Sequence, residues 1–314
     1  MTSSLLFVQA PKGVVMIRPH FFTPNPATAV DNTFQASVDD GLPATTIAQK
    51  AYGEVTEVAR ILTEHGVTVH LFEDEGTQTP DSVFPNNWFS THSGGHIAIY
   101  PMYSESRRHE RRSDVIEMLK KKYRVQDVID YSGLEYDNVF LEGTGAMVLD
   151  HIEHVAYAAR SNRTDPIMLE RFCTNFNYEP VAFDAADATG KAIYHTNVIM
   201  CIGTEYAMIG LDTLVNPVRR REIRERLEST GREVIALSQQ QIAEFAGNAI
   251  ELAGNNGRIL AISSRALASL RPDQIETLER FVTVVPLSIP TIELAGGSVR
   301  CMLAGIHLAE RITT

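Results

Sequence analysis

The chain has 314 residues, of which 44% are hydrophobic, so it is long and apolar enough to bury a large core. Its formal net charge of −11 disfavours nucleic acid and anionic membranes as partners, because both need clustered basic surface. The three cysteines, Cys173, Cys201 and Cys301, form no CxxC pair. We therefore expect neither a zinc site nor a disulfide framework, and the sequence predicts no metal and no cofactor.

The sequence contains no recognisable targeting segment, membrane span or linker, and these absences predict its location and its number of domains. The first ten residues have no basic region, and no stretch approaches about 18 uninterrupted apolar residues. We expect no leader peptide and no membrane span, but a cytoplasmic location that keeps cysteines as thiols. No linker rich in Pro, Gly or Ser interrupts the chain, so residues 1–314 are expected to form a single domain. The sequence leaves the oligomeric state open, a homodimer included.

Short apolar runs and amphipathic segments alternate along the chain. Strands are expected at residues 13–18, 67–72, 97–100, 139–141, 146–149, 154–158, 179–183, 198–202, 206–210, 249–252, 259–263 and 283–286. Helices are expected at residues 45–64, 107–123, 165–173, 216–230, 238–245 and 272–280. Pairs of strands followed by a helix and another strand predict repeated ββαβ units rather than a doubly wound sheet. Neither GxGxxG after a strand nor Walker A occurs.

The C-terminal run GGSVRCM contains the strongest candidate nucleophile, Cys301. The two glycines before it allow positive φ or a close approach to a ligand, and Arg300 lies beside it. A cysteine at a flexible turn near positive charge is typical of a reactive thiol. The alternative is a buried structural cysteine, which is our interpretation of Cys173 and Cys201.

Three further segments combine polar groups with turns. His195 in YHTN precedes a predicted strand and is a candidate acid and base, with Asn197 on the same side if the segment is extended. Glu142 in LEGTG ends an apolar run before glycines. Asp81 and Asn87 lie in PDSVFPNNWF, which sets polar groups among aromatic ones as a small-ligand pocket does. Each segment alone is also compatible with a structural histidine, a hairpin acid or an Asx-rich loop.

Together these segments resemble the guanidine-modifying superfamily of arginine deiminases, dimethylarginine dimethylaminohydrolases and amidinotransferases. The resemblance runs from RPxxFxxNPxTA, at residues 18–29, through DSxFxxN, EGxG, RT and HxN to GGxxRCM. The branch that the chain resembles most is that of the citrulline-utilisation hydrolases. The resemblance implies an α/β fold, the five-bladed pseudo-symmetric propeller of ββαβ units known as the pentein fold. It also implies Cys301 as nucleophile, His195 as general acid and base, and Glu142 as the carboxylate that holds a substrate nitrogen.

The resemblance also implies residues that bind an amino-acid substrate. Arg163 matches the arginine that holds the α-carboxylate, Arg107 matches a second arginine near it, and Asp81 is expected to line the site. Arginine-directed members carry acids where this chain has Asn87 and Asn197. A buried carboxylate without a cationic partner is costly, whereas an amide both donates and accepts, as a neutral ureido group requires.

We therefore expect a metal-independent hydrolase that converts citrulline to ornithine, carbon dioxide and ammonia through an S-carbamoyl enzyme. Hydrolysis of arginine or dimethylarginine to citrulline is the first alternative, because it uses the same residues. An amidinotransferase that passes the group to an amine is the second. A non-catalytic ligand-binding protein on the same fold is the third.

Overall fold

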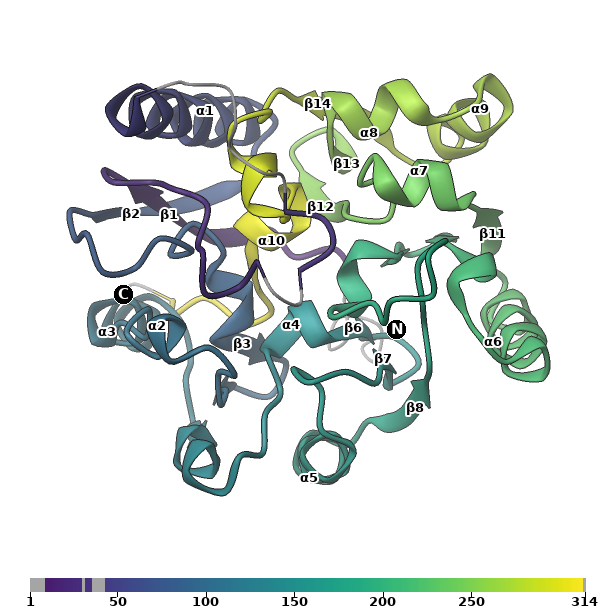
Figure 1. Ribbon diagram of the computed structural model, residues 1–314, viewed down its shortest axis with the longest axis horizontal. Helices are drawn as coiled ribbons and strands as arrows, with labels where there is room; N and C mark the ends of the chain where they lie inside the picture. The colour runs from purple at the N-terminus through teal and green to yellow at the C-terminus, as the bar shows by residue number, and fades with distance from the viewer. Residues whose placement is uncertain (1–8, 30–31, 36–42, 313–314) are drawn as a thin grey trace.

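A computed structural model describes residues 9–29, 32–35 and 43–312 of the chain (Figure 1). Residues 1–8, which belong to the segment where no leader peptide is expected, lie outside the described residues. The described residues form five three-stranded sheets, which Figure 1 shows arranged around a common centre. No helix in the described part of the chain is long and apolar enough to cross a membrane.

The five sheets share one topology. In each, a first strand pairs antiparallel with a middle strand, and the middle strand pairs parallel with a third. The first strands are β3 (Phe89–His92), β6 (Met147–Asp150), β9 (Met200–Ile202), β12 (Ile250–Gly254) and β15 (Ala304–Ile306). The middle strands are β4 (His96–Ile99), β7 (Val155–Ala159), β10 (Tyr206–Ile209), β13 (Gly257–Ser263) and β1 (Gly13–Pro19). The third strands are β5 (Asp127–Asp130), β8 (Glu179–Phe183), β11 (Glu233–Ala236), β14 (Thr283–Leu287) and β2 (Thr68–Asp74).

Helices connect each middle strand to the third strand of its sheet, as a parallel pair requires. These are α1 (Ala44–Glu64), α3 (Ser113–Lys122), α5 (Pro166–Phe176), α6 (Pro217–Ser229), and α8 (Ser264–Ser269) with α9 (Pro272–Glu279). Figure 1 places them on the outside of the sheets. Helix α5 shows why the sequence forms them: Asp165 caps its N-terminus, Pro166 occupies the first turn, and Asn177 ends it in the left-handed region.

The predicted ββαβ units are confirmed, and the last of them is completed by the two ends of the chain. Strand β15, near the C-terminus, pairs with β1, and β1 pairs with β2 across α1. The five first strands line one shared cavity, so the sheets face a common centre. Closure of the five units into a propeller remains a prediction.

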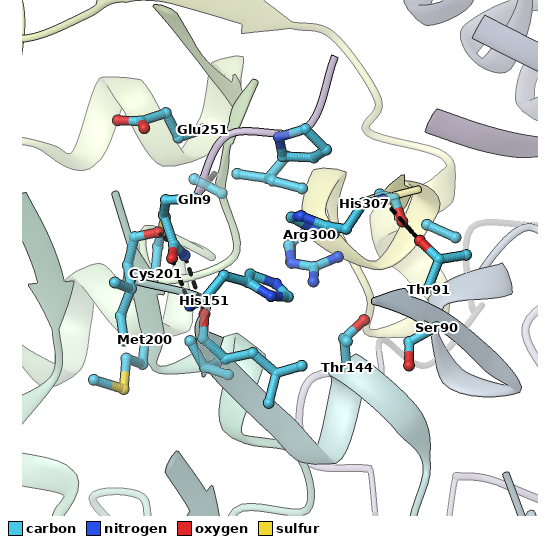
Figure 2. Close-up of a pocket in the computed structure, with 18 of the residues that line it drawn as sticks. Gln9, Ser90, Thr91, Thr144, His151, Met200, Cys201, Glu251, Arg300 and His307 are labelled. Carbon is cyan, nitrogen blue, oxygen red and sulfur yellow. Dashed lines mark hydrogen bonds between the residues drawn. The ribbon is translucent and has the colours of Figure 1, made fainter. Parts of the chain in front are cut away.

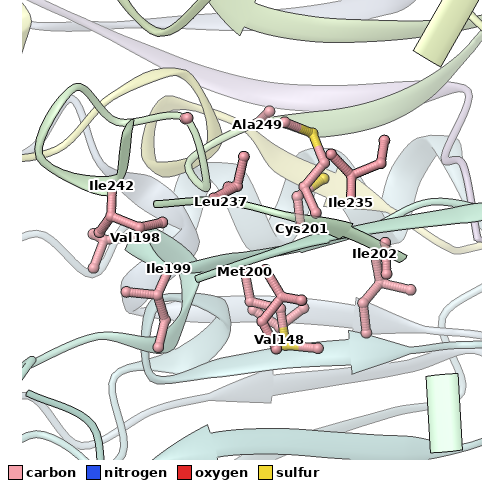
Figure 3. Packing of buried hydrophobic residues seen from close by; sticks show 14 of the residues in the cluster. Val148, Val198, Ile199, Met200, Cys201, Ile202, Ile235, Leu237, Ile242 and Ala249 are labelled. Atoms are coloured by element: carbon pink, nitrogen blue, oxygen red, sulfur yellow. The ribbon is translucent and has the colours of Figure 1, made fainter. Parts of the chain in front are cut away.

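The hydrophobic core lies between neighbouring sheets and under the crossover helices. Figure 3 shows part of the largest cluster, where Cys201 in β9 lies among Ile202, Ile235 and Ala249. Cys173 packs in a second cluster on the buried face of α5. Burial raises the pKa of each of these thiols to about 12. The interpretation of both cysteines as core residues agrees with this packing.

Several predicted boundaries are wrong. The helix expected at residues 107–123 is two helices, α2 (Glu105–Arg108) and α3, because Arg112 is extended between them. Residues 139–141 form no strand, and the Gly-Thr-Gly segment after them is a short helix, α4 (Gly143–Ala146). Strands β3, β5, β11 and β15 were not predicted, and each has only three or four residues. Periodicity is weakly defined over so few positions.

Candidate active site

The candidate site is built from the short segments that precede the five first strands. Asn87 ends a 3-10 helix before β3, Gly145 lies in α4 before β6, Asn197 lies in a 3-10 helix before β9, Asn248 lies in a loop before β12, and Cys301 lies in α10 (Val299–Met302) before β15. Because the strands share a topology, the five positions correspond to one another. Asn197 and Asn248 meet at the thiol of Cys301, and Gly145 lies against Asn87.

Cys301 lies in α10 (Val299–Met302), directly after the glycine turn. Gly296 has φ of +78°, and a Cβ on it would lie 2.5 Å from the amide of Asn32, so glycine is required there. The Cys301 side chain is 3% exposed, and its Sγ accepts hydrogen bonds from two buried amides. Nδ2 of Asn197 lies 3.2 Å away, and Nδ2 of Asn248 lies 3.3 Å away. Two N–H donors are therefore directed at this one sulfur.

His195 and Glu142 form a buried pair beside this thiol. Nε2 of His195 lies 2.8 Å from Oε2 of Glu142, and Nη1 of Arg163 lies 3.3 Å from the same oxygen. Burial raises the pKa of Glu142, but Arg163 and His195 outweigh it and hold this pKa well below its ordinary value. Burial lowers the pKa of His195, and Glu142 opposes that effect. Since the Glu142 carboxylate accepts from Nε2, Nδ1 is the nitrogen available as a base.

Gly145 lies close to both Asn87 and the ring of His195. A Cβ at Gly145 would lie 2.2 Å from Nδ2 of Asn87 and 2.8 Å from Nδ1 of His195. Any side chain there would displace one of the two. The sequence places His195 and Asn197 on the same side only if their segment is extended. Thr196–Val198 is instead a 3-10 helix, and both side chains reach the site.

Arg107 holds Asn87 in place rather than lying free for a ligand. Its Nη1 donates to Oδ1 of Asn87 at 2.6 Å, and its Nε and Nη2 donate to the carboxylate of Glu110 at 2.9 and 2.8 Å. Asp81 lies 3.8 Å from Arg107 and accepts from Asn25 at 2.8 Å. Burial raises the pKa of Asp81, and it raises that of Glu110 to about 7 although Arg107 opposes it.

The structure brings all eight predicted site residues together. Six of them line one cavity, namely Asp81, Asn87, Arg107, Arg163, His195 and Cys301. Glu142 and Asn197 support that cavity from behind, through His195 and Cys301. We refer to this space as the catalytic cavity. Sequence analysis missed Asn248 and Glu110. Asn248 could have been found, because it precedes a predicted strand as Asn197 does. Glu110 could not, because an acid three residues after Arg107 on a predicted helix does not indicate a site.

The described residues contain no group of three or more His, Cys, Asp or Glu side chains that is able to hold a metal ion. What the cavity provides is a thiol with two amide donors, a neutral imidazole with a carboxylate partner, and two arginines. Such a set suits nucleophilic attack on a polar carbon, followed by hydrolysis.

Comparison with solved structures identifies the fold. The N-terminal domain of ArgZ, an arginine dihydrolase from the ornithine-ammonia cycle in cyanobacteria, matches with a TM-score of 0.72 and 16% identity, over 94% of this chain and 97% of that one. AgrE, as a mutant with L-arginine, gives 0.74 and 16%, over 96% and 41%. DDAH from Pseudomonas aeruginosa, as a mutant with citrulline, gives 0.63 and 15%, over 95% and 100%. None of the curated proteins compared with the chain matches it.

The family described as N,N dimethylarginine dimethylhydrolase, eukaryotic, matches residues 18–308. Because this match spans most of the 314 residues, the chain belongs to that family. The family match agrees with the resemblance of the sequence motifs to the guanidine-modifying superfamily.

Proposed function

We propose that the protein hydrolyses the ureido group of citrulline to give ornithine, carbon dioxide and ammonia. The observation that carries this proposal is the pair of amide donors at the nucleophile: Asn197 and Asn248 both direct N–H groups at Sγ of Cys301. When the substrate carbon is bound to this sulfur, the oxygen and nitrogen atoms on that carbon lie beside the two amide donors. A ureido carbonyl oxygen accepts such hydrogen bonds, whereas a guanidinium presents only further donors.

The unpaired oxygen of Asn197 supports the same substrate. Oδ1 of Asn197 is buried and has no hydrogen-bond partner among the described residues. A buried acceptor without a partner costs about 1–3 kcal/mol, which a donating ligand would recover. The NH2 group of citrulline supplies that donor while its carbonyl oxygen meets the amide N–H groups.

The proposed reaction has two steps. Nδ1 of His195 takes the proton of the Cys301 thiol as the sulfur adds to the ureido carbon. The imidazolium then gives this proton to the departing nitrogen, the C–N bond breaks, and ornithine leaves an S-carbamoyl enzyme. Nδ1 of His195 then takes a proton from water, which attacks the carbamoyl carbon and releases the thiol. The resulting carbamate decomposes to carbon dioxide and ammonia. Glu142 stabilises the imidazolium that forms in each step, since its carboxylate already accepts from Nε2.

The two arginines have different roles in this proposal. Arg163 lines the catalytic cavity and lies with its guanidinium 4.7 Å over the ring of Tyr194, which orients it for the substrate α-carboxylate. Arg107 already binds Glu110 and Asn87, so it positions the Asn87 amide. This differs from the sequence expectation, which assigned both arginines to the carboxylate.

Hydrolysis of arginine or a methylated arginine to citrulline is the second candidate. It is favoured by the family match and by two buried carboxylates, Glu142 and Asp81, near the catalytic cavity. ArgZ, with the same fold, is described as an arginine dihydrolase.

Product analysis separates these candidates. The purified chain is incubated in parallel with citrulline, arginine and asymmetric dimethylarginine, and ornithine, citrulline and ammonia are quantified. We expect ornithine from citrulline at the highest kcat/KM, and Cys301→Ser as a control should form none. Citrulline accumulating from arginine, with no ornithine from citrulline, would overturn the proposal. Adding glycine or lysine as an acceptor tests for amidino transfer, for which we expect no product.

Asn197→Asp tests the structural basis of the preference. A carboxylate at this position suits a cationic guanidinium and repels a thiolate and an oxyanion. We expect kcat/KM for citrulline to fall by about 10²-fold, and the ratio of arginine to citrulline turnover to rise. An unchanged ratio would mean that the amide at this position does not select the ureido group.

A further inference from the structure

A second cavity lies between the first strands of the sheets, and Figure 2 shows side chains that line it. Residues of all five first strands line it, and we refer to it as the strand cavity. Its polar lining includes Ser90, Thr91, Thr144, His151, Arg300 and His307. Cys301 does not line it. The proposed reaction uses none of these side chains.

Arg300 is the charged group at the centre of this cavity. Its Nη1 donates to the carbonyl of Leu303 at 2.8 Å, and among the described residues it forms no ion pair. Burial lowers the pKa of Arg300, which means that its charge is poorly solvated. A guanidinium in such a position, with N–H groups still available, is a site for an oxyanion.

Two imidazoles lie beside this guanidinium. The rings of His151 and His307 stack with centroids 3.8 Å apart, and Figure 2 shows both rings next to Arg300. Nδ1 of His151 is engaged by the hydroxyl of Tyr178 at 2.8 Å, which leaves its Nε2 for the cavity. Burial and the neighbouring His307 lower the pKa of His151 well below its ordinary value. The ring is therefore a neutral partner and not a competing cation at neutral pH.

One acid, Glu251, also lines the strand cavity. Figure 2 places it away from Arg300, and its Oε1 accepts from the hydroxyl and the backbone N–H of Thr204. Burial raises its pKa, so its negative charge is disfavoured. Glu251 therefore does not neutralise Arg300.

We propose that the strand cavity binds a small inorganic oxyanion, of the size of phosphate or bicarbonate, between Arg300, His151 and His307. The space left between the lining side chains holds only a few water-sized molecules, which suits an anion of this size and excludes a nucleotide or a peptide. The proposal does not depend on which substrate the catalytic cavity takes.

The site has a direct connection to the nucleophile. The backbone N–H of Arg300 donates to Oδ1 of Asn248 at 3.1 Å, and Nδ2 of Asn248 donates to Sγ of Cys301 at 3.3 Å. An anion that fixes Arg300 therefore also fixes the amide that contacts the thiol. We expect bound anion to change the rate at which Cys301 reacts with iodoacetamide.

Calorimetric titration tests the site. Sodium phosphate and sodium bicarbonate are titrated separately into the full chain at constant ionic strength. We expect millimolar or tighter binding of at least one anion, weakened at least tenfold by Arg300→Gln. Arg224→Gln, which removes an exposed arginine of α6, is the matched control and should bind as the unmodified chain does. Arg163→Gln should also bind normally, because Arg163 belongs to the catalytic cavity.

Diffraction gives a readout that does not depend on a variant. Crystals of the unmodified chain are soaked in selenate, a phosphate-sized anion, and its anomalous signal is located. We expect a peak beside Arg300 in the strand cavity. Binding that Arg300→Gln leaves unchanged, binding lost in Arg163→Gln, or a selenate peak only in the catalytic cavity would overturn the proposal.

Discussion

Cys301 and Cys201 are equally buried, and they show what distinguishes a nucleophile from a core residue in this molecule. Each exposes 3% of its surface. Cys201 lies in β9 among aliphatic side chains, where burial raises its pKa to about 12. Cys301 lies in the short helix α10, and two amide N–H groups contact its sulfur. The difference is therefore not access to solvent but the donors around the sulfur, and three of the following predictions test that difference.

The largest expected effect comes from exchanging the two thiols for hydroxyls. Cys301→Ser should lower kcat for citrulline by at least about 10³-fold, because a serine hydroxyl is a much weaker nucleophile than a cysteine thiol. Cys201→Ser should stay within about threefold, since it touches no reacting group. Steady-state ornithine release checks both. Similar losses in the two variants would remove the distinction between the cysteines.

Glu142→Gln is expected to have the next largest effect, through His195. Losing the carboxylate should lower kcat/KM by about 10²-fold, because the imidazolium formed in the reaction loses its partner. The pKa of His195 lies below its ordinary 6.5, and Glu142 raises it. Removing that charge lowers this pKa further, so the acidic limb of kcat/KM against pH should move to lower pH. A shift of the acidic limb to higher pH would contradict the assignment of His195 as the base.

Asn248→Ala tests whether the second amide activates the thiol. Removing one of two donors at Sγ should slow alkylation of Cys301 by iodoacetamide by about tenfold and lower kcat by about 10–10²-fold. Asn175→Ala is the matched control, because that amide binds the hydroxyl of Tyr131 at 2.6 Å, away from the site. Equal alkylation rates in the two variants would reduce Asn248 to a structural residue.

The smallest expected effect concerns stability. Here the substitution of Cys201 should cost more than the substitution of Cys301, the reverse of their order for activity. Cys201→Ala should lower the free energy of unfolding by about 1–2 kcal/mol, because it leaves a gap in an aliphatic cluster. Cys301→Ala should cost less or stabilise the fold, since polar groups gathered for function are not optimal for packing. Urea denaturation of both variants measures the difference. A larger loss for Cys301→Ala would indicate that this thiol is mainly structural.

The residues of the site were predictable from the sequence where motifs carry them. Cys301, His195 and Glu142 follow from the order of short segments, and the ββαβ repeat follows from paired strands. The direction of Arg300 was not predictable: it follows the glycine turn next to Cys301, but its guanidinium lies in the strand cavity. The backbone after the glycine turn decides whether the Arg300 side chain points towards Cys301 or away from it, and the sequence was compatible with both directions.

The break in the helix expected at 107–123 has a comparable cause. Residues 107–114 contain no apolar residue, so the apolar pattern covers only the second of the two helices. The sequence therefore contains no sign that Arg107 is buried against Asn87 and Glu110. Strand β15 has three residues and no periodicity of its own, and it is fixed by pairing with β1.

The central claim is that Cys301 attacks the ureido carbon of citrulline. Mass spectrometry of the chain, acid-quenched during turnover of citrulline and digested, tests it most directly. We expect the peptide that contains Cys301 to gain the mass of one carbamoyl group, with Cys201 and Cys173 unmodified. Full turnover of citrulline by the unmodified chain without this adduct would contradict the account. An adduct that forms only from arginine, with the mass of an amidino group, would also contradict it.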